Sequence, residues 1–229
     1  MKKFTLIILL LLAFGSFAQD KNPRVYGSFG LEMIFSFATI DNQGYDQGNI
    51  MRWAPVINPQ SMVNIDFNNV FGLFTGLAIR NVGFIYENPI DTEGITKYKY
   101  RTYNLGIPVG FKIGKLDKML FFAGYEIEFP FAYKEKHFVD EEKVSKDVIW
   151  FTDRVEPVQH SLLAGIQFPY GATLKFKYYL TNFHNRDYTT AQGEKPYDFK
   201  SNIFYFSLAW NLFTNWKEYD PKNYKSEMR

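Results

Sequence analysis

The feature that most constrains this chain is a two-residue alternation between bulky apolar side chains and small or polar ones. The clearest stretch covers residues 102–113, where Tyr, Leu, Ile, Val, Phe and Ile alternate with Thr, Asn, Gly, Pro, Gly and Lys. A period of two is that of a β-strand with two different faces, whereas a helix repeats every 3.6 residues or so. Past residue 19 the chain contains no apolar run of about 18 residues, so membrane-spanning helices are not expected.

Segments of this kind recur along the whole chain. We expect strands at 25–37, 59–67, 70–80, 102–113, 120–129, 155–168, 173–180 and 204–212. Short turns are expected at 68–69, 115–118 and 169–171, and long polar connections at 39–54, 81–96, 133–154 and 183–200. Strict alternation of short and long connections predicts an all-β fold: an eight-stranded antiparallel up-and-down transmembrane β-barrel with short periplasmic turns and long extracellular loops.

Side-chain size predicts which face of each strand points outward. One face is dominated by large aliphatic and aromatic residues, and aromatic residues make up 19% of the chain. The other face is rich in glycine, which suits the narrow interior of an eight-stranded barrel. We expect the bulky face to contact lipid and Phe74, Phe122 and Tyr179 to fill the lumen beside the glycines. The alternative is a soluble, lipocalin-like barrel with the apolar face inside.

The beginning of the chain has the pattern of an export signal. Two lysines precede an apolar run over residues 4–14, and Ser16 and Ala18 suit a small-residue cleavage site. Together with the expected barrel, this pattern predicts a protein of the bacterial outer membrane. An even number of strands places both chain termini on the periplasmic side. The expected divisions are a signal peptide at 1–18, the barrel at 19–213 and a periplasmic C-terminal tail at 214–229.

Three stretches resemble the small outer-membrane barrel family often labelled porin-family or PorT-like. They are residues 103–112, 163–180 and 204–213. The resemblance extends along essentially the whole chain past the export signal, and it implies an outer-membrane barrel that ends in a C-terminal β-signal at Phe213. Two departures are the missing glycine at 179–180 and the sixteen residues that follow Phe213.

The lumen-facing set contains four acidic and four basic residues. Because an ionised group inside a narrow barrel is costly unless it is paired, we expect these residues to form a structural ion-pair network that fills the lumen. Its members are Glu32, Asp66, Arg80, Lys112, Glu126, Glu128, Lys175 and Lys177. The alternative is an ion or proton path through the same charges, although eight strands leave little room for a diffusion pore.

Nothing in the sequence assembles a catalytic or metal site, so we expect neither an enzyme nor a bound cofactor or metal. Glu126 and Glu128 share one strand face, which would permit acid/base work, but no substrate cleft accompanies them. His160 and Ser161 are neighbours and should point to opposite faces. The other histidines lie in expected loops without ligand-like spacing.

The expected partners are outer-membrane lipid, lipopolysaccharide and other outer-membrane or periplasmic proteins. Residues 134–146 form a densely charged stretch, for which a solvated outer loop is the simpler interpretation and contact with lipopolysaccharide phosphates the alternative. The lipid-facing wall or the tail would contact proteins. With a net charge of +2 and no evident basic patch, a nucleic-acid partner is not expected.

These observations favour a structural or interaction component of the envelope, and the resemblance suggests an accessory subunit of a secretion or outer-membrane assembly complex. A narrow channel for small solutes or ions is the second hypothesis. The third is a lipid-modifying barrel enzyme, which would need a serine or histidine with a partner on the same face.

Overall fold

The structure is a computed structural model that describes residues 23–42, 45–46, 50–87, 97–116, 118–139 and 141–214. The expected signal peptide and all of the expected tail except Thr214 lie outside these residues. Within them, no helix has the length and apolar character needed to cross a bilayer.

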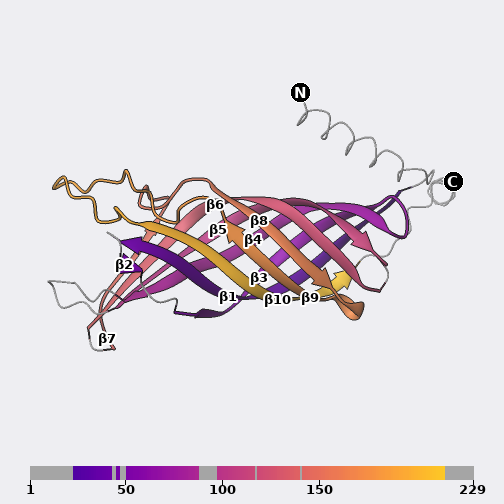
Figure 1. Cartoon of the computed structure of the whole chain (residues 1–229), viewed down its shortest axis with the longest axis horizontal. Coiled ribbons are helices and arrows are strands. Elements are labelled where there is room, and N and C mark those ends of the chain that lie inside the picture. The colour runs from indigo at the N-terminus through magenta and orange to yellow at the C-terminus, as the bar shows by residue number, and fades with distance from the viewer. Residues whose placement is uncertain are drawn as a thin grey trace, which may run out of the picture.

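The described residues form one antiparallel β-sheet closed into a barrel (Figure 1). Its strands are β1 (Arg24–Asn42), β2 (Tyr45–Asp46), β3 (Arg52–Asp66), β4 (Phe71–Glu87), β5 (Lys97–Gly114), β6 (Leu120–Val139), β7 (Glu142–Trp150), β8 (Gln159–Gln167), β9 (Ala172–Tyr179) and β10 (Lys200–Thr214). Eight of them pair with their neighbours in sequence, and β10 pairs with β1 to close the ring. Strands β2 and β7 are hairpin additions on β1 and β6. The expected fold class, an all-β antiparallel up-and-down barrel, is confirmed.

Tight turns join the strands at one end of the barrel. Between β3 and β4 the Asn68 side-chain oxygen accepts hydrogen bonds from the backbone nitrogens of Val70 and Phe71, both at 2.8 Å. Between β8 and β9 lies a 3₁₀ turn, η1 (Pro169–Gly171), in which Gly171 has φ of +79°. That backbone conformation favours glycine. This end is called the short-turn end below, and the opposite one the loop end.

At the loop end, several expected strand boundaries were wrong. Residues 81–87, 133–139 and 142–150 were expected in loops, but they form the end of β4, the end of β6 and strand β7. Strand β8 begins later than expected, at Gln159 rather than 155. These strands extend beyond their expected ends because the pairing with their neighbours continues. For example, β4 pairs with β5 as far as Glu87 and Lys97.

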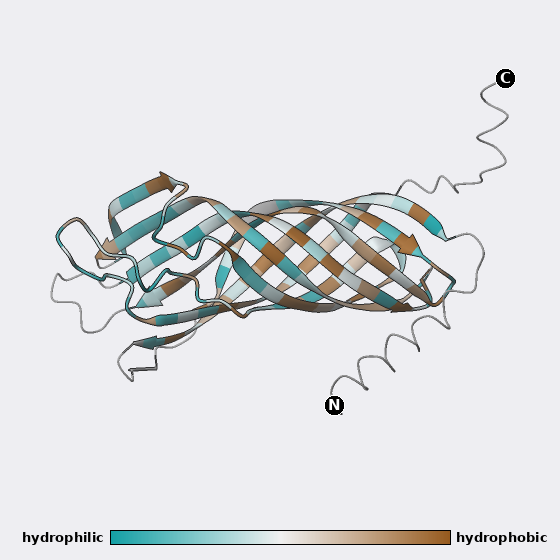
Figure 2. Cartoon of the chain, turned by 90° about the horizontal axis from the view of Figure 1, so that it is seen from above, coloured by the Kyte–Doolittle hydropathy of each residue, from teal (hydrophilic) through white to brown (hydrophobic). Residues whose placement is uncertain are grey.

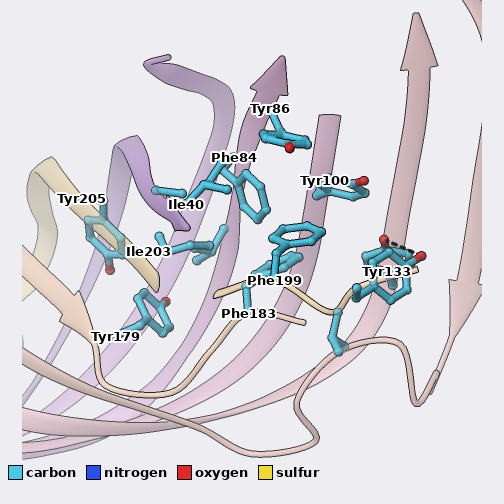
Figure 3. Packing of buried hydrophobic residues seen from close by; sticks show 14 of the residues in the cluster. Ile40, Phe84, Tyr86, Tyr100, Tyr133, Tyr179, Phe183, Phe199, Ile203 and Tyr205 are labelled. Atoms are coloured by element: carbon cyan, nitrogen blue, oxygen red, sulfur yellow. Dashed lines mark hydrogen bonds between the residues drawn. The ribbon is translucent and has the colours of Figure 1, made fainter. Parts of the chain in front are cut away.

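The inward face changes character along the barrel. Towards the short-turn end it carries glycines and charged residues, whereas towards the loop end it carries a buried aromatic and aliphatic cluster (Figure 3). Residues 183–200 were expected as a polar outer loop, yet Phe183, His184, Tyr197 and Phe199 from this connection are buried inside the barrel. These four side chains, with Phe84, Tyr86, Tyr100 and Tyr133 from the strands, are called the aromatic plug.

Candidate functional site: the lumen and the outer wall

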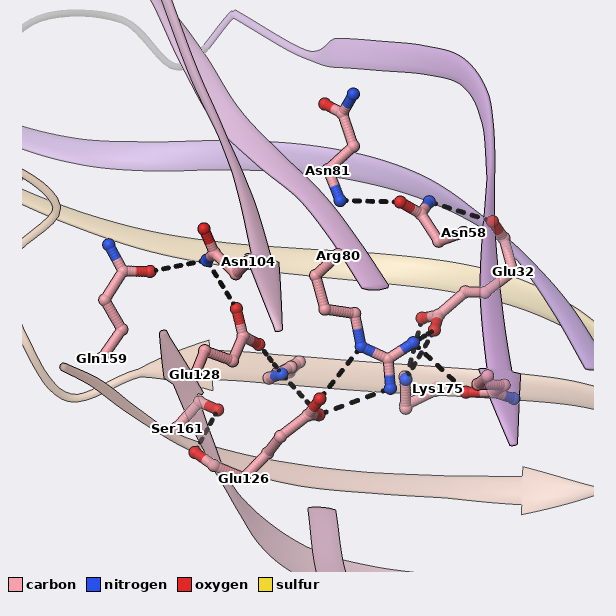
Figure 4. A network of polar contacts seen from close by, with 12 residues as sticks. Glu32, Asn58, Arg80, Asn81, Asn104, Glu126, Glu128, Gln159, Ser161 and Lys175 are labelled. Atoms are coloured by element: carbon pink, nitrogen blue, oxygen red, sulfur yellow. Dashed lines mark hydrogen bonds and ion pairs between the residues drawn. The ribbon is translucent and has the colours of Figure 1, made fainter. Parts of the chain in front are cut away.

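A belt of buried charges lies inside the barrel between the aromatic plug and the short-turn end, and Figure 4 shows its contacts from close by. It holds six of the eight expected lumen residues: Glu32, Arg80, Glu126, Glu128, Lys175 and Lys177. Arg80 pairs with Glu32 and, through Nε at 3.0 Å, with Glu126. Lys175 lies 2.8 Å from Glu32, while Lys177 lies 2.6 Å from Glu126 and also pairs with Glu128.

The charges of this belt balance, since three carboxylates meet three cations. Each of these side chains is 6% exposed or less. Neutral groups supply further hydrogen bonds: Tyr179 donates to Glu128 at 2.8 Å and Asn104 donates to it at 2.7 Å. A buried ion-pair group needs this second set of partners because desolvation otherwise outweighs the Coulomb attraction.

The remaining two expected lumen residues form a separate pair nearer the short-turn end. Lys112 Nζ lies 2.6 Å from Asp66, whose other oxygen lies 3.0 Å from Arg24. Lys112 also donates to the Tyr26 hydroxyl at 2.8 Å. The structure thus divides the eight residues between two groups.

Glycines create the space that the lumen side chains occupy. A Cβ atom added at Gly106 would lie 2.2 Å from a Glu126 carboxylate oxygen. The Phe122 ring lies against Gly165 in the same way, at 2.4 Å from the position of a Cβ. Phe122 packs edge-on against Phe74 with ring centroids 6.0 Å apart. The small residues on the inward face therefore admit large side chains from neighbouring strands.

A cavity of about 80 Å³ lies between the belt and the short-turn end. Its lining includes Arg80, Lys112 and Lys175 beside amide and apolar side chains. A space of this size and polarity suits a few water molecules. The charge belt closes this cavity on the side that faces the loop end.

His184 lies at the centre of the aromatic plug and is fully buried. Its ring stacks on Tyr197 with centroids 4.2 Å apart, and its Nε2 lies 3.4 Å from the Tyr133 hydroxyl. Its Nδ1 has no hydrogen-bond partner among the described residues. Burial lowers the pKa of His184 to about 3, although the Glu135 carboxylate acts in the opposite direction. Neutral His184 therefore belongs to the packed plug.

The residues considered for catalysis do not come together. Ser161 lies inside and donates to the backbone oxygen of Glu126 at 3.0 Å, whereas half-buried His160 contacts the Tyr125 hydroxyl on the other face of the sheet. Glu126 and Glu128 are both engaged by Lys177. Within the part of the chain that the structure describes, no three metal-ligating side chains gather.

The outer wall carries an apolar band between the two ends. Along β5 the outward residues run from Tyr103 to Ile113, and those between them are about half exposed. Ten steps of about 3.3 Å along a strand tilted by about 40° rise about 25 Å, the height of the lipid-facing band of outer-membrane barrels. Hydrophobic residues recur across this wall, and hydrophilic ones dominate the loop end (Figure 2).

The C-terminal end of the barrel is described by its backbone alone. Phe213, the expected β-signal, pairs with Phe29 of β1 and so belongs to the strand that closes the ring. Its side chain lies outside the described residues, as do residues 215–229 of the tail.

Two groups of residues escaped the sequence analysis. The aromatic plug was missed because its members in 183–200 lie in a mostly polar stretch without strand periodicity. A basic cluster on the outer wall, around Lys99, Arg101, Lys134 and Lys136, was missed because its members come from two strands. The available signal was the continued alternation of 97–101, with lysine and arginine at every second position.

No family model and no curated protein matches the chain. Solved structures resemble it weakly. Ail, the attachment invasion locus protein of Yersinia pestis, is 14% identical with a TM-score of 0.40, covering 82% of this chain and 98% of that one. Neisserial surface protein A is 9% identical with a TM-score of 0.37, covering 81% and 99%. The N-terminal β-barrel domain of Pseudomonas aeruginosa OprF is 5% identical with a TM-score of 0.31, covering 81% and 99%. Values this low carry no conclusion about what this chain does.

Proposed function

We propose that this protein is a closed outer-membrane barrel that acts as a structural and interaction component of the bacterial envelope. The observation that most strongly supports this proposal is that the lumen is occluded. A charge-balanced belt closes it at mid-height, and the aromatic plug fills it above the belt. A barrel filled in this way presents its outer wall and its ends to other molecules.

The membrane location is argued from the two faces of the barrel. Charged residues are buried inside at mid-height, while residues such as Leu105, Val109 and Phe111 are 39% to 55% exposed outside. In water this arrangement would expose a large apolar surface, which is rare in soluble monomeric proteins. In a bilayer the same surface is solvated by lipid, and the closed ladder satisfies the backbone hydrogen bonds. The export-signal pattern at 1–18 supports the outer membrane over other membranes.

The finer proposal is that the barrel is an accessory subunit of a larger secretion or outer-membrane assembly complex. The resemblance to PorT-like barrels supports this, and the lipid-facing wall and the C-terminal tail are the surfaces offered to a partner. Photo-crosslinkable residues at Leu105 and Val109 on the wall, with one at Tyr170 in the short-turn end, would test it in native membranes. We expect a reproducible crosslinked protein from one surface; lone barrel from all three positions would contradict a stable partner.

Conductance in planar bilayers tests the occluded lumen. We expect the refolded protein to give no discrete current steps where a small porin, measured in parallel, does. The channel hypothesis predicts steps whose size changes when Glu126 or Lys177 is neutralised. Such steps would replace our proposal with that of a narrow channel.

A further inference from the structure

A cluster of six basic side chains gathers where β5, β6 and β7 run beside one another near the loop end. It consists of Lys99, Arg101, Lys134, Lys136, Lys143 and Lys146, called the basic wall below. In the ladder Lys99 pairs with Lys136 and Arg101 with Lys134. Lys136 in turn pairs with Lys146. Because directly opposite residues share a face of the sheet, these cations are held side by side.

In the described part of the chain, no acidic side chain pairs with these cations. Among the described residues, none of the six forms a salt bridge or a side-chain hydrogen bond, unlike nearby Lys97, which pairs with Glu87 and Glu141. Burial and the neighbouring cations Arg101, Lys146, Lys136 and Lys143 all lower the pKa of Lys134. Like charges in opposite strand positions destabilise a sheet. The basic wall is therefore a place where a bound anion would relieve repulsion.

The cluster also has the form of a site. Lys99, Arg101, Lys134 and Lys136 surround a hollow of about 40 Å³. All four are half-buried, and the Arg101 Nε is buried without a hydrogen-bond partner in the described part of the chain. A guanidinium that has free donors beside ammonium groups matches the oxygens of a phosphate.

The height of the cluster identifies the source of the phosphate. On β5, Arg101 and Lys99 follow the same outward face two and four residues beyond Tyr103, which places them about 5 and 10 Å above the apolar band. Tyr103, Phe131 and Trp150 lie below them, with neighbouring ring centroids 6.4 and 6.1 Å apart. Aromatic side chains of this kind mark the membrane interface. The basic wall thus begins at the headgroup level on the loop side.

We propose that the basic wall binds the phosphate groups of lipid A, the membrane anchor of lipopolysaccharide, in the outer leaflet. The proposal rests on the outer-membrane location proposed above, since short turns face the periplasm and the loop end faces outward in such barrels. The apolar band below the cluster would contact the acyl chains while the lysines and Arg101 contact the phosphates.

Charge-neutral variants of the full-length protein test the site. We compare the triple variant Lys99→Gln, Lys134→Gln, Lys136→Gln with a control that loses the same charge elsewhere, Lys115→Gln, Lys118→Gln, Lys195→Gln. The probe is bisphosphorylated lipid A in nonionic mixed micelles, bound to folded protein. We expect the triple variant to lose about tenfold or more in affinity, in line with lost charge-assisted hydrogen bonds, and the control to stay within about twofold of the wild type.

Two further binding measurements identify the ligand. Dephosphorylated lipid A should bind the wild type as weakly as bisphosphorylated lipid A binds the triple variant. Equal binding of both lipids, or equal loss in both triple variants, would overturn the site. Competition by millimolar inorganic phosphate with full displacement would point to a soluble anion and overturn the lipid assignment.

Heat-modifiable mobility in gels checks that each variant is folded. If the triple variant does not fold, Lys134→Gln alone serves, with about threefold weaker binding expected, in line with one lost charged contact. Unchanged binding in that variant would count against the site. The membrane location is tested separately by fractionation: a protein found outside the outer membrane overturns the proposed function, whereas loss of lipid A binding by an outer-membrane protein leaves it intact.

Discussion

Arg80 joins the two halves of the charge belt, because its guanidinium contacts Glu32 from β1 and Glu126 from β6. We expect Arg80→Met to destabilise the folded barrel by about 3–5 kcal/mol, since two buried carboxylates would lose a charged partner. Urea-dependent unfolding in lipid vesicles, followed by tryptophan fluorescence, measures this. The control is Arg186→Met, because the salt bridge between Arg186 and Asp198 is exposed and should contribute less than about 1 kcal/mol. Equal effects of the two substitutions would contradict a belt that stabilises the barrel.

Gly165 illustrates why glycines line the lumen. A Cβ here would lie 2.4 Å from the Phe122 ring and 2.5 Å from the Leu174 carbonyl oxygen, so Gly165→Ala must relieve both contacts. We expect a loss of about 1–3 kcal/mol in unfolding free energy, as is usual for overpacking. Gly27→Ala is the matched control, because its Cβ would meet only one atom, at 4.0 Å. A Gly165→Ala protein as stable as that control would show that the lumen has spare room.

At the scale of elements, the connection from β9 to β10 enters the interior at both of its ends, while its middle is largely exposed. Phe183 and Phe199 are buried near its two ends, and His184 packs between aromatic rings. The backbone nitrogen of Phe183 also donates a hydrogen bond to the backbone oxygen of Ser201 at 2.8 Å, which links the connection to β10. This connection therefore contributes half of the aromatic plug, and hydrogen exchange of its buried residues reports how well the plug is packed.

Acidification should destabilise the packed form of the plug. Above pH 6.5 His184 is neutral whether the plug is packed or open, so its titration does not change the stability of the packed form. Below 6.5 the open form takes up a proton while the packed form, with a pKa of about 3, does not. Plug stability is therefore lost as the pH falls from 6.5 towards 3, by about 2 kcal/mol at pH 5.

Hydrogen exchange of residues 183–199 between pH 7 and pH 5, corrected for the intrinsic rate, measures this loss. His184→Phe keeps the stacking on Tyr197 but cannot titrate, so its protection should not depend on pH in this range. The same pH dependence in both proteins would assign the effect to another group.

For the whole molecule, the decisive question is where the outer wall contacts lipid. Val109 and Val144 are 55% and 57% exposed, but Val109 lies midway along the apolar band and Val144 lies on β7 at the loop end. We expect Val109→Arg to destabilise the barrel in vesicles by about 2–4 kcal/mol and Val144→Arg by about 1 kcal/mol or less. Unfolding titrations of both variants measure this. Similar values would contradict the position of the band.

Much of the barrel could be predicted from its alternation alone. In residues 102–113 and 204–212 every outward position is bulky, and every inward position except Tyr205 is small or polar. The alternation therefore predicted both the strands and their inward and outward faces. The inward charges were found by the same alternation. Which acid meets which base was not predicted, because Glu32 and Lys175 are 143 residues apart and meet only through the closure of β1 on β10.

The loop end departed from prediction for a related reason. There the inward face becomes aromatic, and on β5 and β6 the outward face becomes basic. Residues 81–87 and 133–139 therefore did not match the lipid-facing pattern. Only the register between strands shows that Tyr100 and Tyr133 share the interior while Arg101 and Lys134 share the wall.

The sequence by itself determined the strands, their faces and the antiparallel fold, because a two-residue period is a local property of an extended backbone. The tertiary structure decided the ion pairs, the basic wall and the burial of Phe183, His184, Tyr197 and Phe199. These depend on barrel closure and on strand register, which bring together residues that no local pattern relates.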